Sequence, residues 1–151
     1  MTEAERFKYI VRIAGKDIDG TLQVVHGLAQ IKGVGVALAN ALCHLLGINP
    51  YERVGLLTES QIAKIEEAIR NPGKYGLPAW MMNRRKDYVT GNDIHLVGAD
   101  LIMAVRADIE RLMKIKCWKG IRHSLGLKVR GQRTRTTGRL GMTVGVRRRR
   151  R

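Results

Sequence analysis

Apolar positions recur at helical spacing along much of the chain and predict four helices. The first is expected over residues 21–30, where apolar side chains follow at intervals of three: Leu22, Val25, Leu28 and Ile31. A second apolar stripe predicts a helix over residues 36–46. Gly47 is typical of the residue that follows a helix, and Pro50 prevents continuation.

Two further helices are predicted by end signals and by longer stripes. Thr58 and Gln61 have the spacing of a capping box, in which each side chain bonds the backbone amide of the other residue, so a helix should begin there. The fourth and longest helix is expected over residues 98–116, with this apolar stripe: Leu101, Ile102, Val105, Ile109, Leu112 and Met113.

The remaining segments read as loops. Residues 10–18 are expected to form a loop or short extended arm, and residues 71–93 a loop in which Trp80 and its neighbours form a hydrophobic plug or, alternatively, a protein contact. No strand pattern is evident, so the predicted fold is all-α. The predicted division is a helical body at 1–93, a long helix and junction at 94–120, and an extended basic tail at 121–151.

Charge divides the chain into two contrasting parts. The 151 residues carry a formal net charge of +15, yet residues 1–110 balance to zero, and residues 111–151 hold every excess cation and no acid. Hydrophobic residues make up 44% of the chain and aromatics only 5%, so the core should consist of Leu, Ile, Val, Ala and Met. From Lys128 onward no apolar period is sustained, which predicts an extended segment that orders on an anionic partner.

Two glycines form the first candidate site. Gly33 and Gly35 lie in a turn between two predicted helices, where a backbone can approach a phosphate closely and the next helix offers outward-pointing amides. A tight turn with no ligand remains the alternative.

The second and third candidates are basic segments at 119–127 and 129–139. Arg binds phosphate in a bidentate manner and stacks on bases, while Thr and Gln reach phosphate and 2′-hydroxyl oxygens. The expected RNA-binding residues are Lys119, Arg122, His123, Lys128, Arg130, Gly131, Gln132, Arg133, Thr134, Arg135, Thr136 and Arg139. A helix cap with solvated charges, or a solvated tail, is the alternative, and the final run of Arg147, Arg148, Arg149, Arg150 and Arg151 could act as a flexible electrostatic anchor.

Other function classes find little support. No catalytic constellation, cofactor motif or metal-ligand spacing occurs, and Cys43 and Cys117 form no Cys-x-x-Cys pair. The most apolar stretch is too short to span a membrane, and the N-terminus does not resemble a signal peptide, so a cytoplasmic location is expected.

Several segments together resemble the universal small-subunit ribosomal protein S-thirteen family. The matching stretches are Ile13–Ile18, Ile31–Gly35, Leu57–Ile62, Asp108–Leu112, Gly120–His123 and Val129–Thr134. The series Arg-His followed by Arg-Gly-Gln-Arg-Thr is highly specific, whereas the Gly-Val-Gly turn is not. The segment 71–93 and the ending 136–146 are similar to the archaeal and eukaryotic branch, with an archaeal source favoured.

The resemblance implies a helix–two-turn–helix body, a long helix and an extended tail, in the head of the small ribosomal subunit. It implies binding to small-subunit rRNA through Arg130–Arg139, and contact with the P-site tRNA through Thr143–Arg151. Further implied partners are the neighbouring ribosomal protein S-nineteen and a large-subunit protein and rRNA at an intersubunit bridge. The body with Gly33 and Gly35 would face either this bridge or rRNA.

Two other functions are compatible with parts of the sequence. A DNA-compacting basic protein would share the charge argument. A DNA glycosylase could use a helix–two-turn–helix module, but it would need an N-terminal nucleophilic proline where this chain has Thr2, and usually a zinc finger.

Overall fold

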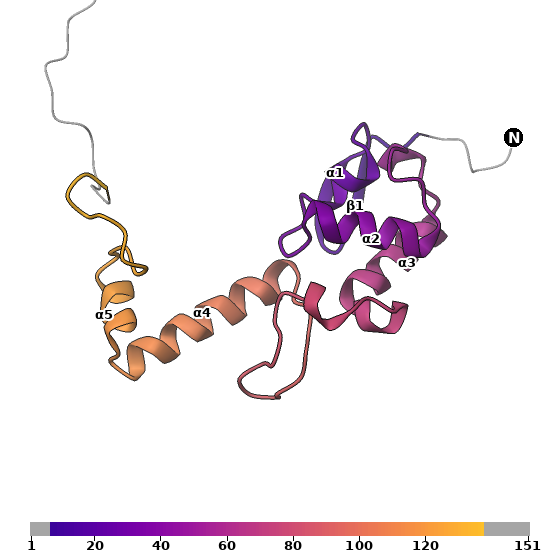
Figure 1. Cartoon of the computed structure of the whole chain (residues 1–151). Coiled ribbons are helices and arrows are strands. Elements are labelled where there is room, and N and C mark those ends of the chain that lie inside the picture. The colour runs from indigo at the N-terminus through magenta and orange to yellow at the C-terminus, as the bar shows by residue number, and fades with distance from the viewer. Residues whose placement is uncertain (1–6, 138–151) are drawn as a thin grey trace, which may run out of the picture. The chain divides into compact units, whose positions relative to one another are not determined.

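The computed structural model describes residues 7–137 (Figure 1). The chain divides into two compact units, one up to Ala104 and the other from Val105 onward. The long helix α4 (Gly98–Lys114) crosses this division.

A β-hairpin opens the N-terminal unit. Strands β1 (Ile10–Ile13) and β2 (Lys16–Asp19) pair antiparallel with Val11 opposite Ile18. The two residues between the strands, Ala14 and Gly15, both have positive φ angles of 49° and 76°, the conformation of a tight hairpin turn that suits twisted strands. The prediction of a loop or arm without strands is therefore wrong here, and the fold is mainly helical rather than all-α.

Helices α1 and α2 follow the hairpin and pack on each other. The first, α1, spans only Val24–Leu28, because the residues before it are drawn into a β-bridge between Gln23 and Arg53. Helix α2 spans Val36–Leu46, as predicted, and ends at Gly47 in the left-handed conformation with φ of 65°.

The body continues through a short 3-10 turn, η2 (Val54–Leu56), into helix α3 (Glu59–Arg70). The predicted capping box is confirmed: the Gln61 amide donates to Thr58 Oγ1 at 3.3 Å, and the Thr58 amide donates to Gln61 Oε1 at 2.9 Å. Two further 3-10 turns, η3 (Pro72–Tyr75) and η4 (Ala79–Met81), lie within the predicted loop.

One aliphatic core holds the N-terminal unit together. Its buried side chains come from the hairpin, the first three helices and the turns between Val11 and Leu77. The largest fully buried members are Ile13, Ile18, Leu28, Ile31, Leu42, Ile65 and Ile69. The prediction of a core built from Leu, Ile, Val and Ala is thus confirmed in the described part of the chain, but no Met of that part is buried in the core, and Cys43 is.

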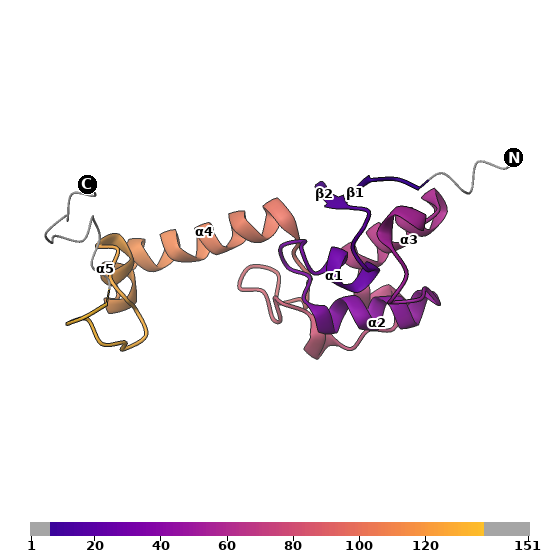
Figure 2. The ribbon, with the colours of Figure 1, turned by 90° about the horizontal axis from the view of Figure 1, so that it is seen from above.

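Helices α4 and α5 (Trp118–Ser124) complete the described elements (Figure 2). The long helix α4 has Asp100 in its first turn and Arg111 and Lys114 in its last, an order of charges that complements the helix dipole. None of its residues is fully buried. Helix α5 was not predicted, since residues 117–124 lack an apolar stripe.

Candidate nucleic-acid interface

Helix α5 is anchored closely against the end of α4. Gly120 is buried, and a Cβ at this position would lie 2.1 Å from the carbonyl oxygen of Leu112, so only glycine permits the contact. Cys117 caps the helix: its Sγ accepts a hydrogen bond from the Gly120 amide at 3.4 Å and donates one to the Leu112 carbonyl at 3.5 Å. These contacts fix the orientation of α5 on the last turns of α4.

The anchored helix carries three of the predicted RNA-binding residues on one side. Lys119, Arg122 and His123 stand three and four positions apart, so their side chains share a helix face. The Arg122 guanidinium lies 5.9 Å from the centroid of the Trp118 ring, and its Nε donates to the Lys128 carbonyl at 2.5 Å. Arg122 therefore ties the following segment back to α5.

The segment after α5 is exposed and irregular as far as the structure describes it. The Arg130 amide donates to Gln132 Oε1 at 3.0 Å, Gly131 has a positive φ of 74°, and the Thr137 hydroxyl donates to the Arg133 carbonyl. All of the predicted residues from Arg130 to Thr136 are exposed. Arg139 and the predicted run Arg147–Arg151 lie outside the described residues.

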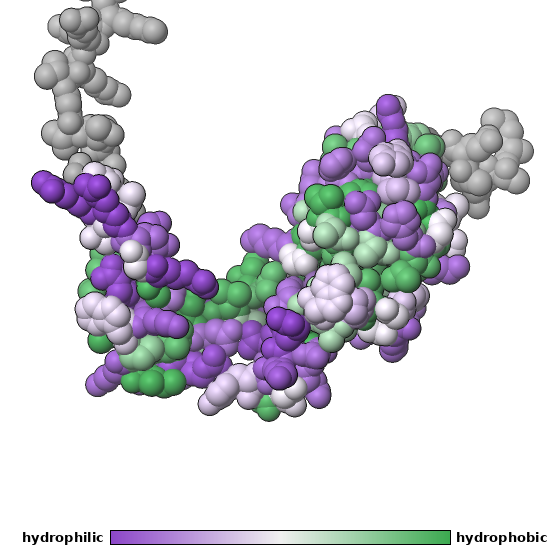
Figure 3. All heavy atoms as spheres, viewed as in Figure 1, coloured by the Kyte–Doolittle hydropathy of each residue, from purple (hydrophilic) through white to green (hydrophobic). Residues whose placement is uncertain are grey.

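The electrostatics of this region are one-sided. Residues 111–137 hold nine Lys and Arg residues and no Asp or Glu. Arg111 pairs with Asp108 at 3.1 Å at the start of the region, but no carboxylate follows it in sequence. Hydrophilic side chains gather around α5 and the segment that follows it (Figure 3). Such a surface can neutralise several neighbouring phosphates.

The two glycines of the candidate turn have different surroundings. Gly33 is half-buried with φ of 100°, and a Cβ there would lie 2.5 Å from the Leu96 carbonyl oxygen. Gly35 is exposed at the N-cap of α2, and a Cβ added there would meet nothing within 4 Å. Close packing against residues 96–97 explains why position 33 needs a glycine. Position 35 has no such neighbour, so a ligand backbone could approach there.

One residue of this surface was missed by sequence reasoning. Trp118 is 69% exposed and stands one turn from Arg122, so an aromatic face and a cation lie together. The signal that could have found it is an aromatic residue directly beside Lys119 in a basic segment, a pattern typical of single-stranded RNA binding.

The described residues offer little for other chemistries. Across residues 7–137 no group of three His, Cys, Asp or Glu side chains could hold a metal ion. Within that same range, no helix is both long and apolar enough to cross a membrane.

A compact, mainly helical body joined to an acid-free cationic segment is the organisation of a nucleic-acid-binding protein. Comparison with known proteins narrows this class. The family model for ribosomal protein S13/S18 matches residues 12–140, and the chain belongs to this family of small-subunit ribosomal proteins. The resemblance found in the sequence is thereby confirmed, and the family is one of structural ribosomal proteins rather than enzymes.

Three archaeal relatives illustrate the extent of the similarity. The chain is 64% identical to small ribosomal subunit protein uS13 of Staphylothermus marinus over 151 residues, 100% of both chains. It is 63% identical to the protein of the same name from Hyperthermus butylicus over 147 residues, 97% of each chain. The corresponding protein of Aeropyrum pernix is 60% identical over 144 residues, 95% of this chain and 96% of the relative.

Proposed function

We propose that this ribosomal protein binds small-subunit rRNA through α5 and the segment that follows it, from Lys119 to Arg139. The observation that carries the proposal is a run of cations that contains no Asp or Glu. The residues from Lys128 to Thr137 are all exposed except Val129, which is half-buried. Counterion release on binding phosphates would supply the affinity.

The two parts of this surface would act differently. Lys119, Arg122 and His123 sit on a short helix whose orientation Gly120 fixes, so they would meet phosphates of one fixed spacing. The irregular segment beyond Lys128 would take its shape from the RNA, because its described part has few internal hydrogen bonds.

The family resemblance supports three further contacts of the chain. The tail ending at Arg147–Arg151 would approach the anticodon stem of the P-site tRNA. The body would neighbour the small-subunit protein S-nineteen and would reach a large-subunit protein and rRNA across an intersubunit bridge, with the exposed Gly35 turn as a candidate contact.

Charge neutralisation of the segment tests the rRNA proposal. The variant replaces Arg130, Arg133 and Arg135 with Gln, and its affinity for small-subunit rRNA is measured over a range of salt concentrations. We expect weaker binding and a salt slope reduced by roughly 0.7 to 0.9 for each phosphate that the variant no longer neutralises.

A matched variant on the body controls for net charge. It replaces Arg53, Lys64 and Lys74, which are exposed cations of the N-terminal unit, with Gln. Equal losses in both variants would contradict the proposal, since binding would then depend only on total charge. Duplex DNA that competes as well as rRNA would instead favour the DNA-compacting function.

Crosslinking tests the proposed tRNA contact. Photoreactive groups placed at positions 147 and 151 should crosslink to P-site tRNA in assembled ribosomes, whereas a group at position 64 should not. Absence of tRNA crosslinks from both tail positions would refute this contact and leave the rRNA proposal intact.

A further inference from the structure

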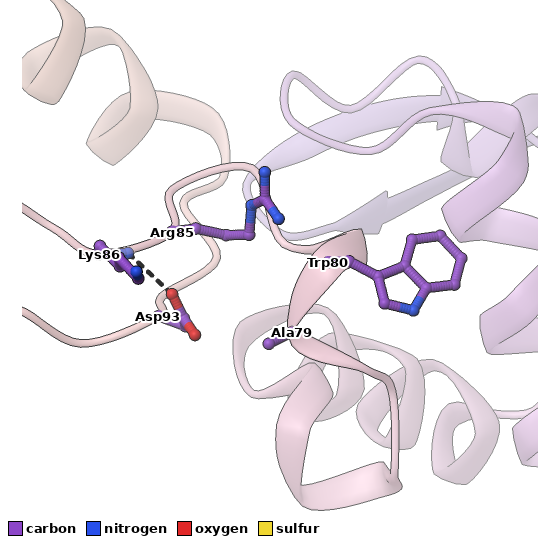
Figure 4. A pocket seen from close by; sticks show the side chains of 5 residues that line it. All are labelled: Ala79, Trp80, Arg85, Lys86 and Asp93. Carbon is purple, nitrogen blue, oxygen red and sulfur yellow. Dashed lines mark hydrogen bonds between the residues drawn. The ribbon is translucent and has the colours of Figure 1, made fainter.

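A second cationic and aromatic surface lies in the N-terminal unit, well before the basic segment in sequence. Trp80 in η4 is 70% exposed, so the predicted hydrophobic plug is wrong for this side chain. Together with the loop that follows, it forms a hollow, called here the Trp80 hollow, lined by Ala79, Trp80, Arg85, Lys86 and Asp93 (Figure 4).

The loop behind the hollow has a fixed conformation. Arg84 and Ile94 form an antiparallel bridge, with backbone hydrogen bonds of 3.2 and 2.9 Å. Asn83 secures the base of the loop, because its side chain donates to the Leu96 carbonyl at 2.7 Å and accepts from the Leu96 amide at 2.9 Å. The residues that line the hollow are therefore positioned before any ligand arrives.

Internal hydrogen bonds occupy the first acid of the loop. Asp87 is buried and accepts from Arg84 Nε at 2.5 Å and from the Thr90 amide and hydroxyl at 3.1 Å. The hydrogen bond from Arg84, followed by that from the Thr90 amide, lowers the pKa of Asp87 to about 2. Both oxygens of this carboxylate are occupied by hydrogen bonds within the loop, which stabilise its tip.

Asp93, Arg85 and Lys86 differ from Asp87 in having side-chain groups that no internal contact occupies fully. One oxygen of Asp93 accepts the Lys86 amide at 2.7 Å, a contact drawn in Figure 4. Arg85 and Lys86 are exposed, and neither side chain takes part in an ion pair within residues 7–137. In Figure 4 the Arg85 side chain extends from the loop toward the side on which Trp80 projects.

These groups match the parts of a single nucleotide. An exposed indole offers a flat face on which a base can stack, and every base has a complementary π-face. Two cations without carboxylate partners can bind the adjoining phosphates. In Figure 4 Asp93 lies beside Lys86, on the side of the hollow away from the Trp80 indole, so its carboxylate takes no part in the proposed stacking contact.

We propose that the Trp80 hollow binds one unpaired nucleotide of small-subunit rRNA, with the base stacked on Trp80 and phosphate held by Arg85 and Lys86. This proposal rests on the proposed rRNA-binding function but places a separate contact on the other unit of the chain.

Tryptophan fluorescence tests the stacking directly. The chain has two tryptophans, so the full-length Trp118→Phe variant reports on Trp80 alone. On titration with small-subunit rRNA, base stacking should quench the Trp80 emission. Emission that stays constant while rRNA binds, as followed by an independent filter assay, would overturn the proposal and leave rRNA binding by the basic segment standing.

Affinity measurements supply a second test. The full-length Trp80→Ala variant should bind small-subunit rRNA roughly 5- to 150-fold more weakly, the range that loss of one stacked base produces, and Trp80→Tyr should restore most of the affinity. Tyr51→Ala is the matched control, because Tyr51 is 76% exposed on the same unit and outside the hollow.

Two outcomes of the affinity measurements would contradict the proposal. If Trp80→Ala binds rRNA normally but its small subunits join large subunits poorly, the hollow contacts a protein or RNA of the other subunit instead. If Tyr51→Ala loses as much affinity as Trp80→Ala, the effect is not specific to stacking at this site.

Discussion

Gly120 gives the sharpest prediction about the RNA-binding unit. A Cβ at this position would lie 2.1 Å from the Leu112 carbonyl oxygen, 2.5 Å from the Leu112 carbonyl carbon and 2.8 Å from the Met113 amide nitrogen. In Gly120→Ala the shortest of these distances must open from 2.1 Å to at least 3.0 Å. The obstructing atoms belong to the α4 backbone, so no side-chain rotation can relieve the clash, and α5 must move away.

The free-energy cost of Gly120→Ala follows from the size of this clash. Overpacking of a well-packed site destabilises the packed state by about 1–3 kcal/mol. This range shifts the equilibrium between the anchored and detached states of α5 by a factor of roughly 5 to 150. The N-terminal unit should keep its melting temperature, because its buried core lies between Val11 and Leu77.

Hydrogen exchange and RNA binding together measure this effect. Protection of the Ile121 and Leu125 amides, which donate within α5 at 3.0 and 3.1 Å, should fall in Gly120→Ala. Affinity for small-subunit rRNA should fall too, since the α5 cations lose their fixed spacing. Gly73→Ala is the matched control, because the nearest atom there is the flexible end of Met82 at 3.2 Å. Unchanged protection and affinity in Gly120→Ala would refute the reasoning.

Three other substitutions test the fold around the sites. Thr58→Ala removes the α3 capping box and should lower the free energy of unfolding by about 1 kcal/mol in urea denaturation, and no change would mean that the box does not stabilise the helix. Asp87 has its pKa lowered from 3.8 to about 2, chiefly by the Arg84 hydrogen bond, so its stabilisation is complete above about pH 4 and is lost as pH falls toward about 2. Hydrogen exchange in the loop should show this acid-dependent step in the natural chain and not in Asp87→Asn, and a step of equal size in both would contradict the assignment. Gly33→Ala places a side chain at φ of 100° and 2.5 Å from a carbonyl oxygen, so its melting temperature should fall well below that of Gly35→Ala, and equal melting temperatures would refute that packing argument.

The helices that the sequence predicts well are those with both a stripe and an end signal. Helix α2 has a full apolar face followed by Gly47, and α3 has its capping box, so local chemistry alone defines both. The predicted first helix begins too early, because a tertiary bridge between Gln23 and Arg53 takes up the residues before Val24. Long-range pairing of this kind leaves no local signal.

The hairpin and α5 were missed for different reasons. Each strand of the hairpin is four residues long, too short for a clear alternation, although the buried Val11 and Ile13 do alternate with exposed neighbours. Helix α5 depends on a cysteine cap and on a glycine buried against another helix, and neither is a usual helix-forming signal. Trp118 went unrecognised, and Trp80 was expected in a hydrophobic plug or a protein contact, because sequence alone does not reveal which aromatic side chains the fold leaves uncovered.

The charge distribution was the part of the candidate site that sequence predicted best. Net charge is additive, so the acid-free region from Arg111 onward could be located by summing along the chain. Summing charges does not show which cations lie on the same face. The spacing of Lys119, Arg122 and His123 places them on one face only if residues 118–124 form a helix, and the sequence did not predict that helix.

The most direct test of the account compares the salt dependence of rRNA binding in two chains, the full chain and one that ends at Leu125. The full chain should lose affinity for small-subunit rRNA steeply as salt rises. The shortened chain should bind weakly, with a slope smaller by roughly 0.7 to 0.9 for each phosphate that only the full chain neutralises, while the circular dichroism of its helices persists. Equal slopes in the two chains, or loss of the helical signal on shortening, would contradict the claim that a folded body carries a separate RNA-binding segment.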